Sequence, residues 1–430
     1  MFEQSKKGER ALLVHLKLHD HQQETSIDDE FRELALSAGA KVMGTISTKY
    51  DNPDPKYLIR KGKAQEVHDY VKEHEIEVVL IDHKISPIQG RNLEKLLGCK
   101  VLDRTDLILD IFAQRARTFE GKLQVELARL EHLSTKLVRG WTHLERQKGG
   151  IGLRGGPGET QLEVDKRLIR ERIKHIRLQL KKVRQQRALS RRARHKAQIP
   201  TVSLVGYTNT GKSTLFNTIT GDSIYAADKL FATLDPTFRS VCLPYIGKVI
   251  LADTVGFIRD LPHSLIDAFQ ATLDETKDAD LLLHIIDCHD ELWQDRKRQV
   301  ESVLASIGAL NVPILEVYNK IDLVDDLQEG IERNEDGIVS LVRISAIKGR
   351  GIDILLSSVA ERLSNKLISG KLKLTAKQAR ERALLYDVGV VDKEEIDADG
   401  NWILEIKIQQ KDWCKLCNQC SGLEDSFLKQ

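Results

Sequence analysis

The sequence predicts an α/β protein of several domains, and three patterns support this fold class. Residues 206–213, GYTNTGKS, match the phosphate-loop pattern G-x-x-x-x-G-K-[ST] and lie between a strand-like stretch and an amphipathic helix. Residues 9–117 alternate strand-like and helix-like segments, which is typical of a parallel sheet covered by helices. From residue 119 onward, apolar residues recur at the three- and four-residue spacing of long helices.

Length and composition agree with a folded protein of more than one domain. A chain of 430 residues corresponds to roughly two to four domains. A hydrophobic content of 41% with only 9 prolines is typical of ordered proteins, and 6 cysteines in so long a chain do not make a disulfide framework. No apolar run approaches the roughly 20 residues that span a bilayer, and the first residues lack the apolar core of a signal peptide. We therefore expect a cytoplasmic protein, with peripheral membrane association left open.

The patterns divide the chain into four expected domains. An N-terminal α/β domain covers 1–118, and a helical hairpin with a glycine-rich basic tip covers 119–197. The domain of the phosphate loop covers 198–365, and a small C-terminal α+β domain covers 366–430. The boundary between the hairpin and the phosphate-loop domain falls at residues 198–200, which include a proline.

The N-terminal domain shows the alternation expected of a small parallel sheet. We expect strands at 11–18 and 78–81 and helices at 28–37, 63–73, 89–97 and 105–115. No phosphate-loop pattern occurs here, so the sequence indicates no catalysis in this domain. The basic stretch 58–63, LIRKGK, either contacts RNA or a nucleotide or is the solvated entrance of a helix, and the helix entrance is favoured.

Two helical runs predict an αα-hairpin with an unusual connection. The runs are Leu123, Leu127, Leu130, Leu133, Leu137 and Trp141, and then Leu162, Ile169, Ile173, Ile176, Leu180 and Val183. Residues 149–160 between them hold six glycines, and Arg146, Lys148 and Arg154 make this connection basic. So glycine-rich a loop cannot form its own core. We interpret it as a flexible basic tip presented to an anionic partner; the alternative is a plain surface loop.

The second helix of the hairpin becomes strongly basic toward its end. Its cationic residues, with no acid between them, are Lys181, Lys182, Arg184, Arg187, Arg191, Arg192, Arg194 and Lys196. A charge run is usually a solvated helix face, but a run of one sign and this length favours contact with nucleic-acid phosphate. Such binding should weaken steeply as the salt concentration rises.

Four residues of the phosphate loop have an expected role in binding phosphate or Mg²⁺. Gly206 and Gly211 let the backbone fold into a nest of N–H groups around phosphate oxygens, helped by the positive end of the following helix. Lys212 is expected to reach the β- and γ-phosphates, and the Ser213 hydroxyl to bind Mg²⁺.

Four further motifs follow the loop, and three of them end apolar strands. At 253–256, DTVG, the aspartate can hold Mg²⁺ through water and the glycine N–H can sense a γ-phosphate. In 231–235, FATLD, the threonine can complete the Mg²⁺ shell. At 319–322, NKID, the aspartate can accept both N1–H and the 2-amino group of guanine. At 345–347, SAI, a backbone N–H could meet the guanine O6.

Five motifs in this order predict a GTPase domain that uses Mg²⁺. The expected catalytic residues are Lys212, Thr233 and Gly256, and the expected Mg²⁺ ligands are Ser213 and Thr233. The expected nucleotide-binding residues are Gly206, Tyr207, Thr208, Asn209, Thr210, Gly211, Lys212, Ser213, Phe231, Ala232, Thr233, Leu234, Asp235, Asp253, Thr254, Val255, Gly256, Asn319, Lys320, Ile321, Asp322, Ser345, Ala346 and Ile347.

The basic tip and the nucleotide motifs together resemble the HflX family of ribosome-associated, translation-factor-related GTPases. The residues that carry the resemblance are 155–163, GGPGETQLE, with 206–213, 231–235 and 253–257. The resemblance extends from about residue 9 to about residue 365 and is weakest at the C-terminus. It implies binding to the large ribosomal subunit, with the glycine-rich tip directed at ribosomal RNA. It also implies a role in separating or rescuing ribosomes under stress.

The family pattern also carries over to single positions. It implies that phosphate and Mg²⁺ are bound by Lys212, Ser213, Thr233 and Asp253, and that the base is read by Asn319, Lys320 and Asp322. Phe257 stands where many GTPases place a water-orienting glutamine, so hydrolysis should be slow alone and stimulated by ribosomes. Asn209 stands where cation-dependent relatives help to hold K⁺, and a K⁺ site is left open.

The C-terminal domain carries weaker signals. We expect a helix at 376–385 and a strand pair at 388–396 and 402–408. Cys414, Cys417 and Cys420 have the spacing C-x-x-C-x-x-C, but neither Cys nor His follows as a fourth ligand. Structural cysteines are therefore favoured over a metal site.

Two functions from different classes follow from these observations. The first is a GTP-hydrolysing factor that acts as a monomer on the large ribosomal subunit. The second is a non-enzymatic RNA-binding scaffold whose nucleotide site only stabilises the fold. Phosphate release that ribosomes accelerate would distinguish the first from the second.

Overall fold

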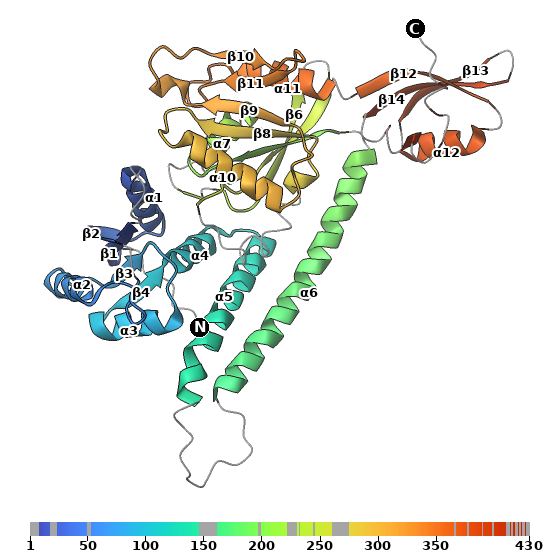
Figure 1. The fold of residues 1–430 in the computed structure, drawn as a ribbon. Helices are drawn as coiled ribbons and strands as arrows, with labels where there is room; N and C mark the ends of the chain where they lie inside the picture. The colour runs from blue at the N-terminus through green and yellow to red at the C-terminus, as the bar shows by residue number, and fades with distance from the viewer. Residues whose placement is uncertain are drawn as a thin grey trace. The chain divides into compact units, whose positions relative to one another are not determined.

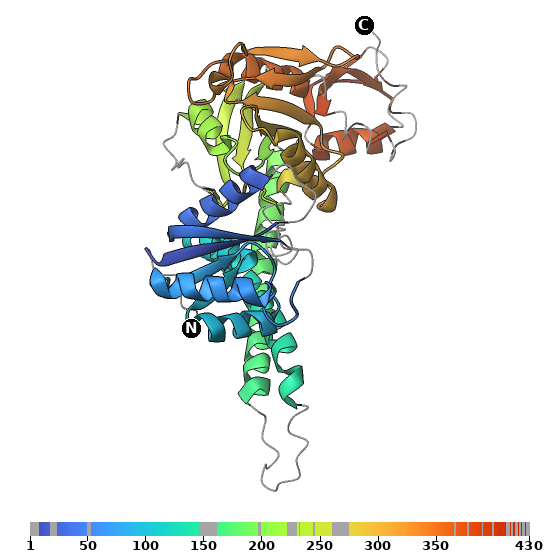
Figure 2. The ribbon, with the colours of Figure 1, turned by 60° about the vertical axis from the view of Figure 1, so that its left-hand side comes forward.

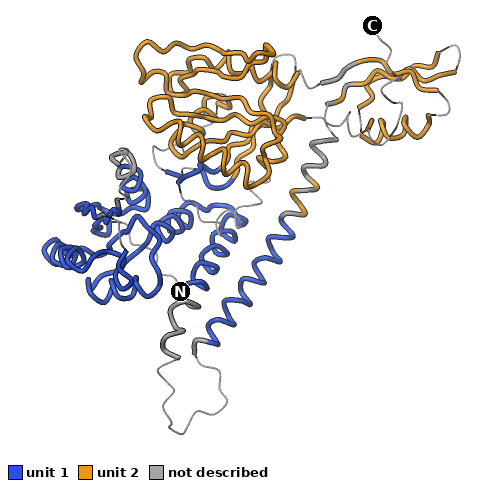
Figure 3. The backbone as a smooth tube through the Cα atoms, in the orientation of Figure 1, with its two compact units in different colours: residues 1–183, 225–235, 255–272 blue, residues 184–224, 236–254, 273–430 orange. Residues whose placement is uncertain are grey.

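The structure is a computed structural model in which the chain forms two compact units (Figure 3). Unit 1 comprises residues 1–183, 225–235 and 255–272, and unit 2 comprises residues 184–224, 236–254 and 273–430. The described residues are 8–17, 24–49, 53–145, 161–196, 199–221, 230–231, 233–243, 246–259, 275–364, 367–375, 378–388, 390–397, 400–409, 413, 416–417, 420, 423 and 426.

Unit 1 begins with a four-stranded parallel sheet of order β2-β1-β3-β4. Its strands are β1 (Arg10–Lys17), β2 (Lys41–Lys49), β3 (Val78–Ile81) and β4 (Lys100–Asp103). Its helices are α1 (Glu24–Ser37), α2 (Lys61–Glu73), α3 (Pro87–Leu97) and α4 (Arg104–Arg115). Helices α2 and α3 pack on one face of the sheet, and α1 and α4 cover the other (Figure 2). The predicted small parallel α/β fold is therefore confirmed.

Two strands of this sheet were absent from the sequence-based expectation. β2 has the sequence KVMGTISTK, in which polar residues and a glycine leave no continuous apolar run, because it is an edge strand. β4 is only four residues long and also lies at an edge. The basic stretch 58–63 does form the entrance of α2, with Leu58 and Ile59 buried and Arg60 as the N-cap.

The helical hairpin consists of α5 (Phe119–Glu145) and α6 (Gln161–Lys196), labelled in Figure 1. Seven of the predicted periodic residues form its seam: Leu123, Leu127 and Leu130 of α5 pack with Ile169, Ile173, Ile176 and Leu180 of α6. The side chains of Leu137, Trp141 and Leu162 lie outside the described residues. Arg172 bonds Glu126 at 2.7 Å and Arg177 bonds Glu131 at 2.8 Å across the same seam. The glycine-rich tip lies outside the described residues.

Unit 2 is built on a seven-stranded sheet of order β10-β11-β9-β8-β5-β7-β6. Its strands are β5 (Thr201–Gly206), β6 (Thr237–Leu243), β7 (Gly247–Asp253), β8 (Leu281–Asp287), β9 (Ile314–Asn319), β10 (Gly330–Arg333) and β11 (Val339–Arg343). Only the outer strands β6 and β10 run antiparallel to their neighbours. Its described helices are α7 (Lys212–Thr220), α10 (Trp293–Ser306), α11 (Ile352–Ser364) and the 3-10 turn η1 (Ile321–Leu323).

The centre of this sheet is buried on both faces, which explains its continuous apolar strands. Every residue of β5 is buried, and β8, with the sequence LLLHIID, is buried up to its last residue. Parallel strands under helices need this composition. Because β5, β7, β8 and β9 are parallel, their carboxyl ends lie along one edge, and the nucleotide motifs follow these ends.

The C-terminal part of unit 2 is a three-stranded antiparallel sheet of order β12-β14-β13 with one described helix. Its elements are β12 (Leu367–Leu374), α12 (Ala379–Val388), β13 (Val391–Ile396) and β14 (Trp402–Gln409). The expected strand pair is present as β13 and β14, and β12 adds a third strand that was not expected. The expected strand start at residue 388 was wrong, since Val388 closes α12 and packs against the apolar core. Cys420 is buried in that core, and Cys414 lies outside the described residues.

Among the helices of the described residues, none combines the length and the apolar composition that crossing a membrane requires.

Candidate nucleotide-binding site

Two glycines, Gly206 and Gly211, shape the phosphate loop. Gly206 has φ 153° and Gly211 has φ 91°, and both values favour glycine. A Cβ at Gly206 would come closer than 3.0 Å to the Ile285 carbonyl oxygen, and one at Gly211 equally close to Asn319 Nδ2. Asn209 adopts φ 61°, which asparagine tolerates better than most residues. The loop therefore wraps closely over the end of β5 before α7 begins.

Lys212 places a buried cation inside this loop. Its ammonium donates to the Gly206 carbonyl at 3.0 Å and also to the Tyr207 carbonyl. Burial lowers the pKa of Lys212 to about 8, although the nearby Asp253 carboxylate acts in the opposite direction. The loop thus holds a weakly solvated positive charge, which an anionic ligand would stabilise.

Ser213 and Asp253 meet next to this cation. The Ser213 hydroxyl donates to Asp253 Oδ2 at 2.8 Å. The two residues are adjacent because β7 pairs with β5, with Asp253 opposite Leu204. The next residue, Thr254, anchors the chain by donating from its hydroxyl to the Leu204 carbonyl at 2.6 Å. A hydroxyl beside a carboxylate is a set of hard oxygen donors, which fits Mg²⁺.

Asn319 connects three of the predicted motifs through its side chain. Its Nδ2 donates to the Thr210 carbonyl at 2.8 Å, and its Oδ1 accepts from the Ala346 N–H at 2.9 Å. The amide is buried, so both hydrogen bonds are shielded from water. The Ala346 N–H is therefore engaged by Asn319.

The residues that follow Asn319 complete the second half of the site. Lys320 has φ 66° and its ammonium pairs with Asp287 Oδ2 at 2.7 Å. Asp322 Oδ1 accepts from the Ser345 hydroxyl at 2.6 Å, which orients the carboxylate. Ile321 is buried, whereas Ile347 is 74% exposed.

Residues 230–235, which contain the predicted threonine, pack within unit 1. The Leu230 N–H donates to Ser37 Oγ at 3.2 Å, and the Phe231 ring meets the Phe112 ring edge-on at 4.6 Å. Leu230, Phe231 and Leu234 are buried, Thr233 is half-buried, and Ala232 lies outside the described residues.

Asp235 fixes the end of this segment on the two residues that precede α5. Its Oδ2 accepts from the N–H groups of Arg117 and Thr118, each at 2.9 Å, and its Oδ1 accepts from the Thr118 hydroxyl. Gly121 leaves room for this carboxylate, because a Cβ there would come closer than 3.0 Å to Asp235 Oδ1. The Asp235 carboxylate therefore accepts hydrogen bonds from the residues at the base of the hairpin.

Residues 255–259 also belong to unit 1. Val255, Phe257 and Ile258 are buried, so the Phe257 ring is an apolar packing residue. The Arg259 carbonyl accepts from Arg104 Nη2 at 3.4 Å. Arg104 itself is buried and pairs with Asp82 at 2.8 Å and with Glu30, so it is a fixed donor.

The structure thus groups the predicted site residues into two sets. Unit 2 brings together the phosphate loop with Asp253 and Thr254, and it joins them through Asn319 to the base-reading motifs. Residues 231–235 and 255–256 pack instead in unit 1.

Three supporting contacts in unit 2 were not foreseen. Asp287 holds Lys320, Arg296 lies over the Tyr207 ring with its guanidinium carbon 5.0 Å from the ring centre, and Thr218 donates to the Ala346 carbonyl at 3.0 Å. Asp287 could have been found, because it ends β8 as Asp253 ends β7. The other two contacts have no signal in the sequence.

Comparison with known families places matches along most of the chain. Residues 25–113 match a family model described as GTP-binding GTPase N-terminal, and 115–194 match the GTP-binding GTPase middle region. Residues 201–320 match the 50S ribosome-binding GTPase model, and 330–423 match the HflX C-terminal domain.

Curated relatives agree with these matches over most or all of their length. GTPase HflX of Escherichia coli K12 is 51% identical over 430 residues, which is 100% of both chains. GTPase HflX of Magnetococcus marinus is 45% identical over 379 residues, covering 88% of this chain and 87% of that one. GTPase HflX of Caldanaerobacter subterraneus subsp. tengcongensis is 44% identical over 400 residues, covering 93% and 91%.

Proposed function

Because the chain belongs to the HflX family of GTPases, we propose that it hydrolyses GTP at the phosphate loop as a factor of the large ribosomal subunit. The observation that carries the proposal is the match of residues 201–320 to a ribosome-binding GTPase model, on a loop that buries Lys212. The wider role proposed is the separation or rescue of stalled ribosomes under stress.

The phosphate end of the site supplies positive charge where GTP carries most of its negative charge. The loop N–H groups and the first turn of α7 bind the phosphates. Lys212 exchanges its carbonyl partners for β- and γ-phosphate oxygens, which stabilises charge that develops on the γ-phosphate. Ser213 and Thr233 are the proposed Mg²⁺ ligands, with Asp253 acting through water; the ion neutralises the phosphates when bound.

The other end of the site distinguishes guanine from adenine. The Ser345 hydroxyl orients the Asp322 carboxylate, which is then available to accept two N–H groups from guanine. Lys320, whose ammonium pairs with Asp287, is a further proposed base-reading residue. Asn319 links this end to the phosphate loop, so binding of a nucleotide at one motif would also affect the other.

Phe257, the residue after Gly256, is the reason we expect slow GTP hydrolysis when no partner is bound. Phe257 has no group that can orient water, and its ring is buried in apolar surroundings. The Thr233 and Gly256 segments respond to the γ-phosphate, and a ribosomal partner provides the missing stimulation. This arrangement keeps the GTP form until the ribosome is met.

The helical hairpin is the proposed ribosome-binding arm. Its second helix carries the basic run from Lys181 to Lys196, and exposed Lys181 and Lys182 offer two of these charges to solvent. The glycine-rich tip that joins the helices is proposed to contact ribosomal RNA. We propose that the protein acts as a monomer in the cytoplasm.

Phosphate release with and without purified large ribosomal subunits tests the proposal. We expect subunits to accelerate release by wild-type protein and Lys212→Ala to abolish that acceleration. Lys248→Ala removes an exposed lysine of the same unit and serves as the matched control. If subunits bind but never accelerate release, the protein is the RNA-binding scaffold instead.

A further inference from the structure

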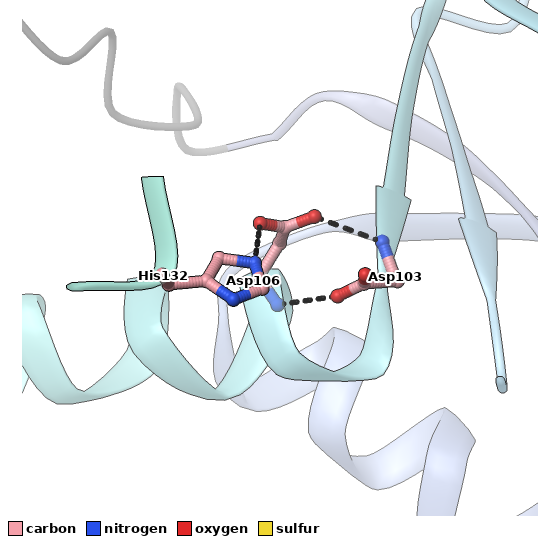
Figure 4. Close-up of side chains that lie close together, drawn as sticks. All are labelled: Asp103, Asp106 and His132. Carbon is pink, nitrogen blue, oxygen red and sulfur yellow. Dashed lines mark hydrogen bonds and ion pairs between the residues drawn. The ribbon is translucent and has the colours of Figure 1, made fainter. Parts of the chain in front are cut away.

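A second cluster of ionisable side chains lies in unit 1, where β4 and α4 meet α5 (Figure 4). Asp103 is the last residue of β4, Asp106 lies in the first turn of α4, and His132 projects from α5. One donor atom of each residue lies within 4.8 Å of the other two. Nothing in the proposed GTPase mechanism uses these residues.

The backbone of α4 holds both carboxylates in fixed orientations. Asp103 accepts from the Asp106 N–H at 2.8 Å, and Asp106 Oδ2 accepts from the Asp103 N–H at 3.2 Å. This reciprocal capping box uses Oδ1 of Asp103 and Oδ2 of Asp106. The remaining oxygens are Asp103 Oδ2 and Asp106 Oδ1, and the latter lies 3.0 Å from His132 Nε2 (Figure 4).

Asp103 Oδ2 is the carboxylate oxygen of this cluster that accepts no hydrogen bond from the described residues. The residue is only 1% exposed, and this oxygen has no hydrogen-bond partner among the described residues. A buried carboxylate oxygen in this state costs free energy that a bound cation would recover. Burial, followed by the neighbouring Asp106 carboxylate, also raises the pKa of Asp103.

A cation already reaches the cluster in the form of the Lys136 ammonium. It lies 2.8 and 2.6 Å from the two oxygens of Asp106 but 3.8 Å from Asp103 Oδ2. Lys136 therefore forms hydrogen bonds with the Asp106 carboxylate but lies too far from Asp103 Oδ2 to form one. Its side chain is 32% exposed, so its flexible end is free to turn toward solvent.

We propose that Asp103, Asp106 and His132 bind a divalent transition-metal cation, which replaces the Lys136 ammonium. One imidazole nitrogen and two carboxylate oxygens suit Zn²⁺ or Co²⁺, with water in the fourth position. Mg²⁺ prefers oxygen ligands and is not expected here. The bound cation would tie the start of α4 to α5 and so brace the base of the hairpin.

The test uses Co²⁺, whose visible absorption reports its ligands, and the full chain free of nucleotide and Mg²⁺. We expect Co²⁺ binding that weakens by at least about tenfold in Asp103→Asn and in His132→Gln. His175→Gln changes an exposed histidine of α6 and should leave binding unaltered. Lys136→Met keeps all three ligands and removes the competing charge, so it should tighten binding by about tenfold.

Two results would overturn the assignment. One is Co²⁺ affinity that is the same in wild type, His132→Gln and Lys136→Met, since the cluster would then be an ion-pair network only. The other is strong thiolate charge-transfer absorption that survives in His132→Gln, which would move the metal to the C-terminal cysteines. The Lys136→Met titration decides the matter even if a ligand variant fails to fold.

Discussion

At the scale of single residues, Lys212 links the chemistry of the site to pH. Its pKa lies near 8 in the free protein because burial disfavours the charged form. Bound phosphate would favour the charged form, so the complex keeps a proton that the free protein loses above pH 8. GTP affinity should therefore fall as the pH rises through 8.

Calorimetry at pH 8.5 in two buffers of different ionisation enthalpy measures this proton directly. We expect net proton uptake when GTP binds to the wild type. In Lys212→Arg the cation stays charged at this pH, so the uptake should vanish in whatever binding remains. Uptake that persists in this variant would assign the proton to another group.

Base selection is the second property that belongs to one residue. Ser345 orients the Asp322 carboxylate at 2.6 Å, and the carboxylate is proposed to accept two N–H groups of guanine. Asp322→Asn should weaken GTP binding by about 1.5–3 kcal/mol, or roughly ten- to a hundredfold, and should improve binding of xanthosine triphosphate. GTP affinity is measured by nucleotide titration. Equal affinities in the wild type and in Asp322→Asn would show that Asp322 does not bind the base.

At the scale of elements, the two residues that precede α5 hold the segment that ends at Asp235. Gly121→Ala would push a methyl group into that carboxylate and loosen the segment, costing about 1.5–3 kcal/mol of unfolding free energy. Gly62→Ala is the matched control, because the same change in α2 meets open space and should stabilise by about 0.5 kcal/mol. Thermal unfolding and amide exchange at Leu234 and Asp235 measure both effects. Equal shifts in the two variants would show that the docking contributes nothing.

The basic part of α6 makes a prediction about salt. Neutralising Arg191, Arg192 and Arg194 together should weaken binding to the large subunit and reduce its logarithmic salt slope by roughly 2 to 3. Nucleotide affinity should not change. The same charge loss at Lys248, Arg298 and Lys393, which are exposed elsewhere in unit 2, should leave the slope intact. An unaltered slope in the first variant would make this part of α6 a solvated face.

Elements with strong periodicity were predictable from the sequence, and marginal ones were not. β3 has the expected bounds, and the α5–α6 seam uses seven of the expected residues, because burial imposes a clear apolar pattern on both. Edge strand β2 lacks such a pattern. Val388 is compatible with either a helix or a strand, and the packing of α12 places it in the helix.

The positions of the candidate site residues were predictable where these residues end strands of the parallel sheet, and their roles stay predictions. Asp253 and Asn319 occupy such positions, and their chemistry follows from the residue types. The bond between Thr118 and Asp235 joins residues 117 apart, and no local pattern encodes it. Long-range contacts of this kind depend on how the elements pack, so they require the structure.

At the scale of the whole molecule, the two segments proposed to respond to the γ-phosphate belong to the unit that contains the base of the arm. Their described residues, 230–231, 233–235 and 255–259, belong to the same unit as α5 and most of α6, although their neighbours in the sequence belong to unit 2. The arm also leads into β5 within a few residues of Lys196. A nucleotide-dependent change in either segment is therefore positioned to alter the arm.

The energy needed for such control is small. A tenfold preference of the ribosome for the GTP form requires a difference in contact free energy of about 1.4 kcal/mol. Three hydrogen bonds at Asp235 are sufficient to supply it, provided that they differ between the two nucleotide states. Slow hydrolysis, which Phe257 favours, would maintain the GTP form until the subunit is bound.

The central claim is that GTP controls binding to the ribosome, and one comparison tests it most directly. The affinity of the protein for purified large subunits is measured with a non-hydrolysable GTP analogue and with GDP, at one fixed salt concentration. We predict at least about tenfold tighter binding with the GTP analogue. Equal affinities in the two nucleotide states would contradict the account, whatever the rate of hydrolysis.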